Sequence, residues 1–224
     1  MKALWDLRDE PEKKPRMPLS VSAIVDAAIA IADEDGIEAI SMQRVAADLG
    51  FTKMSLYRHV SNKSELLSIM IDSAVGEPPD LSEVPGGWRA KLEEFVRLLA
   101  EVWRRHPWLP AITVGARVMG PREAGWTEAA VAALAGTGLT GDERMAAAFL
   151  LFGHVRNTQS LITAGTQAWS GGSEMAELIR GRADLFPELS AALSGPTPAL
   201  DDNARSFGLN RLLDGLAVLI EERS

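Results

Sequence analysis

The sequence contains no cysteine, so disulfide bonds and thiolate metal sites are excluded. No run of about 18 apolar residues is present, so we expect no membrane-spanning helix. Residues 1–17 are charged and lack the apolar stretch of a signal peptide. No strand-like alternation and no internal repeat are apparent. Together these absences favour a helical, cytoplasmic protein that does not interact with membranes.

The sequence also lacks the common signatures of enzymes and metal sites. His106 and His154 are the only histidines outside residues 41–63, and neither belongs to a His-x-x-x-His or His-Glu-x-x-His pattern. No Gly-x-Ser-x-Gly motif and no glycine-rich phosphate loop with a lysine occurs. We therefore expect no enzymatic activity, no cofactor and no metal.

Charge is unevenly distributed along the 224 residues. The whole chain carries a net charge of −8, which argues against an indiscriminate nucleic-acid binder. Residues 41–63, however, contain four basic residues (Arg44, Lys53, Arg58 and Lys63) and a single acid, Asp48. This segment is therefore locally positive, as a specific contact with DNA phosphates requires.

The same segment has the pattern of two short helices joined by a tight turn. Ser41 and Thr52 are suitable N-terminal caps, and Gly50 can take the left-handed conformation that ends a helix. The apolar residues recur at helical spacing and form one buried edge: Val45, Ala46, Leu49, Leu56 and Val60. Two helices this short need a third helix to cover them.

A third helix is predicted upstream, between a cap at Ser20 and a stop at Gly36. Its apolar residues follow the i, i+3, i+4, i+7 pattern: Ile24, Ala27, Ala28, Ile31 and Ala32. The three helices together predict a helix-turn-helix unit, which places its second helix in the major groove of DNA.

The residues of this unit also carry a family resemblance over about residues 20–70. Ala-Ile-Ser-Met-Gln-Arg-Val-Ala-Ala-Asp-Leu-Gly-Phe, then Ser-Leu-Tyr-Arg-His-Val and Asn-Lys-Ser-Glu-Leu-Leu, resemble the DNA-binding domain of TetR-family transcriptional regulators. The resemblance implies an all-α fold and a homodimer that binds a double-stranded DNA operator. It also implies release from a palindromic operator by a small-molecule effector, that is, a repressor.

Three regions are predicted. Residues 1–17 form a flexible arm, whose Lys13, Lys14 and Arg16 either touch DNA or are simply solvated. Residues 18–75 form the helix-turn-helix domain with a connector helix that begins at Lys63. Residues 76–224 form a helical domain for ligand binding and dimerisation. Its helices are expected over 88–106, 121–135, 142–164 and 207–222, with short helices near 174–180 and 187–193.

The resemblance assigns DNA contacts to the start of the second helix and to its flanks. Thr52, Lys53 and Met54 would meet base edges; the alternative for Met54 is core packing. Three neighbours would bind phosphate: Ser55, Tyr57 and His59. Lys63 would add a phosphate anchor at a helix N-terminus. On the preceding helix Gln43 can reach a base, and Arg44 either binds phosphate or is solvated.

Aromatic residues of the C-terminal region predict a mostly apolar ligand pocket. Its candidate lining is Trp103, Trp108, Trp126, Phe149 and Phe152, and the alternative is ordinary aromatic core. Polar groups to orient a ligand are expected at His106, Arg156 and Asn157.

The helices predicted over 142–164 and 207–222 offer small residues and a broad apolar stripe, which favour a four-helix bundle between two subunits. Ordinary monomer core is the alternative. Two other functions stay open at this point: a transcriptional activator or a repressor that answers to a protein partner, and a helical small-molecule binding protein without a DNA function.

Overall fold

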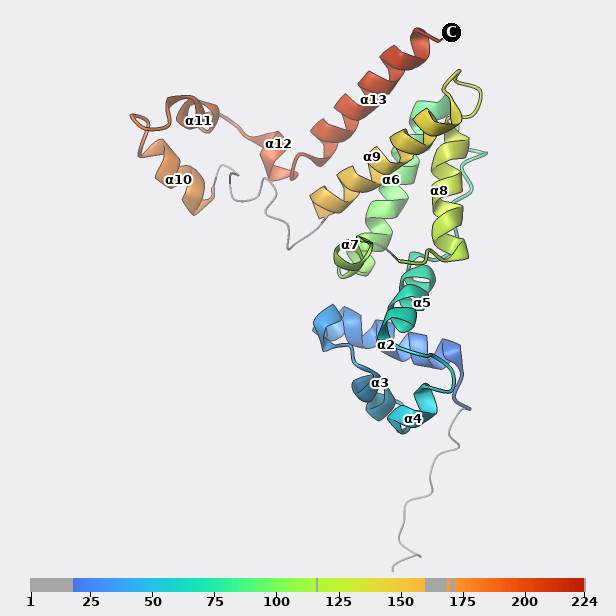
Figure 1. Ribbon diagram of the computed structural model, residues 1–224. Helices are drawn as coiled ribbons and strands as arrows, with labels where there is room; N and C mark the ends of the chain where they lie inside the picture. Colours follow the sequence, from blue (N-terminus) through green and yellow to red (C-terminus); the bar gives the residue numbers. More distant parts are fainter. Residues whose placement is uncertain (1–17, 116, 160–168, 170–171, 224) are drawn as a thin grey trace, which may run out of the picture.

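The computed structural model describes residues 18–115, 117–159, 169 and 172–223. All regular structure in these residues is helical, which confirms the expected all-α class. Figure 1 shows a small helical unit at one end, a larger bundle at the other and helix α5 between them. The arm predicted over 1–17, including Lys13, Lys14 and Arg16, lies outside the described residues.

The small unit is the predicted helix-turn-helix. Its elements are α2 (Val21–Asp35), the short η2 (Ile37–Ala39), α3 (Met42–Asp48) and α4 (Lys53–Leu56). All three predicted caps are present: the hydroxyl of Ser20 accepts from the N–H of Ala23, Ser41 from Arg44, and Thr52 from Ser55. Each cap satisfies one of the amide groups that a helix start leaves without a partner.

The core of this unit is made by the apolar edges that the periodicity predicts. Its fully buried side chains come from α2, α3, α4, α5 and the segment between α4 and α5: Ile24, Ala28, Val45, Leu56, Val60 and Leu66. Leu49, which was expected on the same edge, is only partly buried against this core. Burial of these side chains holds α4 against α2 and α3, so that the opposite face of α4 is free to meet a partner.

Helix α5 (Lys63–Val75) joins the two parts of the molecule. It packs against α2 on one side and against α8 (Pro121–Ala133) on the other. Met70 and Ile71 are buried within the same continuous core. Helix α5 therefore connects α8 and the helix-turn-helix unit through continuous packing contacts.

The larger bundle contains α6 (Gly87–Arg105), the short α7 (Leu109–Ile112), α8, α9 (Gly141–Gln159) and α13 (Arg205–Glu221). Helix α9 contacts α6, α8 and α13. The ring of Phe95 lies at the centre, edge-on to Trp126 at 5.7 Å and to Phe152 at 5.5 Å between ring centroids. The C-terminal part of the long helix predicted over 142–164 lies outside the described residues from 160 onward.

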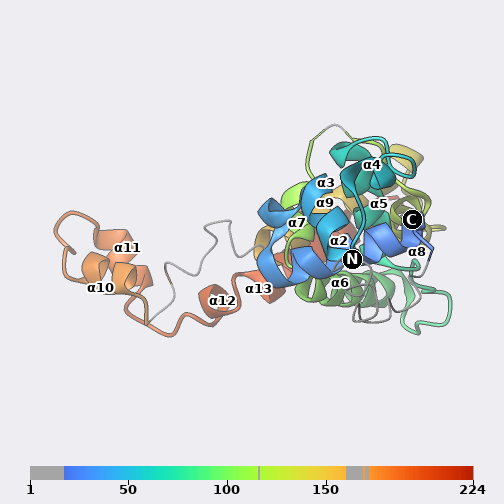
Figure 2. The same ribbon diagram turned by 90° about the horizontal axis from the view of Figure 1, so that it is seen from below.

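Three short helices project from this bundle, as Figures 1 and 2 show from two directions. They are α10 (Glu174–Arg180), α11 (Pro187–Ala192) and α12 (Pro198–Asp201). Helices α10 and α11 share a small core of their own, made by Ala176, Ile179 and Leu193. The short helices predicted near 174–180 and 187–193 are thereby confirmed. No helix among the described residues is long and apolar enough to span a bilayer.

Candidate functional site

The turn between α3 and α4 has the geometry that its glycine predicts. Gly50 adopts φ +69°, a left-handed conformation that costs little without a Cβ. The N–H of Phe51 then donates to the carbonyl of Ala46 at 2.8 Å, and that of Gly50 to Ala47 at 3.0 Å. The turn is closed by these two bonds, and α4 leaves it in a fixed direction.

The outward face of α4 presents Thr52, Lys53 and Met54, all exposed. Met54 is 69% exposed, so the alternative of core packing for this residue is wrong. The ammonium of Lys53 lies 5.5 Å from the centroid of the Tyr57 ring, a cation–π distance. Lys53 and Tyr57 therefore form one exposed pair beside Met54.

Ser55 and His59 complete this face in different ways. The hydroxyl of Ser55 lies 2.9 Å from that of Thr52, within the cap of α4. His59 is exposed on the turn that follows α4, where its backbone N–H donates to the carbonyl of Leu56 at 2.9 Å. Thr52 and Ser55 thus hold the helix start, whereas His59 is exposed beside it.

On α3, Gln43 and Arg44 are both exposed, but Arg44 is not simply solvated. Its guanidinium pairs with the carboxylate of Asp35, at the end of α2. Counting charges along residues 41–63 missed this compensation, because Asp35 comes from outside that segment. The uncompensated positive charge of the face therefore lies with Lys53, Arg58 and Lys63 rather than with Arg44.

Lys63 begins α5, and this helix start is more fully capped than expected. The side chain of Asn62 accepts from the N–H of Glu65 at 2.9 Å, and Glu65 accepts from the N–H of Ser61 at 2.6 Å. The bond from Ser61 lowers the pKa of Glu65, which keeps its negative charge. Some of the backbone N–H groups that were expected to bind phosphate at this helix start therefore already have partners. The positive charge at this position comes from the Lys63 ammonium.

The larger bundle contains a cavity of about 350 Å³ between α6, α8, α9 and the segment 113–119. Five of the predicted pocket residues line it: Trp103, Trp126, Phe149, Phe152 and Arg156. Its size is at the lower end of the range that small-molecule sites occupy. The abundance of aromatic residues in the C-terminal region was therefore a useful signal for this cavity.

Trp108 and His106 lie elsewhere. The indole N–H of Trp108 donates to a carboxylate oxygen of Asp33 at 2.6 Å, and Nδ1 of His106 lies 2.8 Å from the same oxygen. Neither residue lines the cavity; both tie the start of α7 to the end of α2. The prediction for these two residues is corrected in this respect, because their partner is 73 to 75 positions away and invisible to local periodicity. Asn157 is exposed on α9 and does not line the cavity either.

One wall of the cavity is an ion pair that the sequence did not reveal. Both terminal nitrogens of Arg117 donate to the carboxylate of Glu123, at 2.7 and 2.5 Å. Glu123 is only 8% exposed, and this bidentate bond gives its buried carboxylate a charged partner. Arg117 belongs to an irregular segment with no motif, and only the burial of Glu123 in the first turn of α8 identifies the pair.

Glu123 also lies at the joint between the two parts of the molecule. The carboxylate of Asp72, on α5, accepts from the backbone N–H groups of Arg122 and Glu123 at 2.8 and 3.1 Å. Asp72 thus caps α8 from another helix. Arg122 in turn pairs with Glu77 at 2.8 Å. The N-terminus of α8 is therefore bound to the C-terminal end of α5 and to the residues that follow it.

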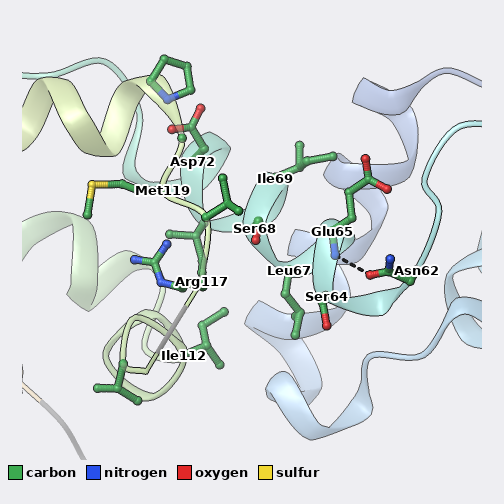
Figure 3. Close-up of a pocket in the computed structure, with 15 residues that line it drawn as sticks. Asn62, Ser64, Glu65, Leu67, Ser68, Ile69, Asp72, Ile112, Arg117 and Met119 are labelled. Carbon is green, nitrogen blue, oxygen red and sulfur yellow. Dashed lines mark hydrogen bonds between the residues drawn. The ribbon is translucent and has the colours of Figure 1, made fainter.

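A second, more open cavity of about 750 Å³ lies between α5 and residues 112–121. In Figure 3, Ser64 and Leu67 of α5 face Ile112 and Arg117 across it. Val114, Arg117 and Met119 line both cavities. Residues 113–115 and 117–119 are therefore a thin partition, with the ligand-sized cavity on one side and the connector helix on the other.

Comparison with known proteins agrees with this geometry. The family model described as "Bacterial regulatory proteins, tetR family" matches residues 24–69, and that described as "Tetracyclin repressor-like, C-terminal domain" matches residues 79–220. The HTH-type transcriptional repressor DrrR1 of Streptomyces coeruleorubidus is 36% identical over 100% of this chain and 86% of its own length. An HTH-type transcriptional regulator of Saccharopolyspora erythraea is 31% identical over 88% of this chain and 82% of its own.

Solved structures show the same arrangement. The crystal structure of the Streptomyces coelicolor TetR family protein ActR in complex with actinorhodin has a TM-score of 0.74 and 28% identity, covering 91% of this chain and 99% of that one. ActR in complex with (S)-DNPA has a TM-score of 0.73 and 25% identity, covering 93% and 100%.

Proposed function

The chain belongs to the TetR family of transcriptional regulators, and from that membership we propose that it is a homodimeric repressor which a small hydrophobic ligand releases from a palindromic operator. The DNA would be bound through α4 and its flanks, with Lys53 and Met54 on base edges. Tyr57, His59 and Lys63 would hold phosphates. Relatives named as repressors, and ActR structures that contain small molecules, support this function.

The observation that carries the proposal is that the cavity and the DNA-binding unit share a joint. Val75, the last residue of α5, and Glu123, in the first turn of α8, both line the cavity. The backbone N–H of Glu123 donates to the carboxylate of Asp72 on α5. Lys63, at the other end of α5, lies next to the predicted DNA-binding face. A ligand that displaces either lining residue would therefore move α5 and the helix-turn-helix unit with it.

Dimerisation would convert a movement of α5 into a loss of DNA affinity. Helices α9 and α13 pack together and leave large apolar side chains exposed, among them Leu150, Phe207 and Val218. Joining these faces across a two-fold axis would form a four-helix bundle and bury them. Two α4 helices must then lie about 34–36 Å apart to enter successive major grooves. A change in their separation weakens both contacts together, so a ligand that weakens DNA binding must itself bind more weakly to the DNA-bound form.

The test begins with selection of bound duplexes from a random pool, followed by fluorescence anisotropy on the selected duplex. We expect a palindrome, a dimer in sedimentation at micromolar concentration, and affinity that falls steeply with salt. A compound from a library of hydrophobic metabolites should then release the DNA and perturb tryptophan fluorescence. A monomer, or a pool without enrichment, would reject the proposal.

A further inference from the structure

The charges in the cavity are not balanced. Three of its lining residues are ionisable: Arg117, Glu123 and Arg156. Arg117 and Glu123 neutralise each other through two hydrogen bonds. Arg156 has no carboxylate within ion-pair distance among the residues that the structure describes. The cavity therefore carries one positive charge without a counterion.

Arg156 is also incompletely hydrogen-bonded. Its Nε is buried and has no acceptor within the described part of the chain. Burial, and the nearby charge of Arg117, lower the pKa of Arg156. Its guanidinium lies 5.8 Å from the centroid of the Trp103 ring, which offers only a weak compensation. A buried donor and charge of this kind is costly for a free protein and becomes favourable when a ligand supplies the acceptor.

The rest of the cavity wall selects the shape of that ligand. Four aromatic side chains line it together with Arg156: Trp103, Trp126, Phe149 and Phe152. Phe149 is 54% exposed, so it lies at the mouth, whereas Trp126 is buried. These aromatic side chains favour an aromatic ligand, because two aromatic rings can pack in stacked or edge-on contacts. A saturated chain of the same volume would gain less from these walls.

We propose that the effector is a planar aromatic compound with one negative charge, such as an aromatic carboxylate, whose anion pairs with Arg156 while its rings lie between the aromatic side chains. The inference rests on the proposed function only in taking this cavity as the effector site. A neutral analogue leaves Arg156 without its acceptor, and a cationic analogue places a like charge beside it. Both should bind more weakly than the anion.

Three compounds of one shape test this: 2-naphthoate, 2-naphthamide and 2-naphthylmethylamine, titrated calorimetrically into the full chain without DNA. We expect 2-naphthoate to bind tighter than the amide by about tenfold or more, since hydrogen bonds to a charged group add 1.5–3 kcal/mol. The amine should bind most weakly. Equal or tighter binding of the amide or the amine, or no binding of any of the three at millimolar concentration, would overturn the inference.

Variants at Arg156 locate the effect. Arg156→Met keeps an unbranched apolar stem but removes the guanidinium, and it should abolish the preference for 2-naphthoate while leaving the affinity for the amide within about threefold. Arg156→Lys should restore part of the preference, which guards against a folding defect in the methionine variant. Arg104→Met, an exposed arginine on α6, is the matched control and should change nothing. A preference that survives Arg156→Met would contradict the inference.

The two proposals can fail separately. Operator binding by the ligand-free protein, and the oligomeric state, test the proposed function without any naphthalene compound. If no duplex is bound but the preference for 2-naphthoate depends on Arg156, the cavity keeps its assigned ligand class and the repressor function is wrong. If DNA is bound and released by some compound, yet the amide binds as well as the acid, only the ligand class is wrong.

Discussion

The helix-turn-helix unit and the larger bundle fill their interiors differently. In the former, caps satisfy the helix starts, and apolar side chains such as Leu56 and Val60 fill the space between the helices. The latter encloses a cavity of about 350 Å³ with a buried ion pair and the partly unsatisfied Arg156. The first region is built for one rigid shape. The second has the empty volume and the incompletely bonded polar group that a binding site needs, and such features are expected to cost stability.

The largest effect is expected from a cavity made in the rigid region. Leu56→Ala removes a fully buried side chain and should lower the free energy of unfolding by about 2–5 kcal/mol. Met54→Ala, on the exposed side of the same helix, should change it by less than about 0.5 kcal/mol. Urea denaturation measures both. If Leu56→Ala were tolerated as well as Met54→Ala, the contrast between the two regions would not hold.

Next come the charges on the surface of the rigid region. Lys53→Ala should relax the preference at one base pair per half-site, by about 1–3 kcal/mol if the contact is bidentate. Lys63→Ala should weaken all duplexes about equally and reduce the salt dependence, because a phosphate contact carries no base identity. Binding to the selected palindrome and to single-base variants of it separates the two. Identical behaviour of both variants would contradict the division of roles.

A change at the joint between the two regions should have a smaller effect on the free energy of unfolding. It should have a clear effect on the coupling between ligand binding and DNA binding. Asp72→Ala uncaps α8 and should cost about 0.5–2 kcal/mol. It should also reduce the factor by which a ligand weakens DNA binding. Asp80→Ala is the control, since the carboxylate of Asp80 accepts from the N–H of Ser82, within its own loop and not from α8. Thermal denaturation and paired titrations with and without ligand measure these effects. An unchanged coupling factor would show that the signal does not pass through this cap.

The smallest effect concerns the exposed pair of Arg44 and Asp35. Arg44→Ala should change the free energy of unfolding by at most about 1 kcal/mol, because both partners are solvated. DNA affinity should fall less than in Lys63→Ala, since the charge of Arg44 is already compensated. Asp35→Ala frees Arg44 and should tighten binding to random duplex at low salt. A double-mutant cycle checks the coupling of the pair.

Much of the rigid region was readable from the sequence because its signals are local. The caps at Ser20, Ser41 and Thr52, and the left-handed Gly50, each act within a few residues and lie where they were predicted. The paired charge of Arg44 was not predicted, because an ion pair between residues on different helices has no local pattern.

The cavity was predicted less completely for the same reason. The abundance of aromatic residues in the C-terminal region assigned Trp103, Phe149 and Phe152 to it, and all three line it. Composition does not identify what a given ring contacts, so Trp108 was assigned to the cavity although it contacts Asp33. Arg117, in an irregular segment, gave no periodic signal at all. The ion pair between Arg117 and Glu123 was identified only from the three-dimensional structure.

The bonds to Asp33 also determine how this protein can be recombined. A chimera that joins the larger bundle of this protein to the DNA-binding domain of another regulator would take α2 from the other regulator. Unless the donor has an acid at the position of Asp33, the indole N–H of Trp108, in a side chain only 4% exposed, loses its acceptor, at a cost of about 1–3 kcal/mol. Biosensors assembled from such parts would therefore need an acid at the position of Asp33 in the foreign α2, to meet Trp108 and His106 of the larger bundle.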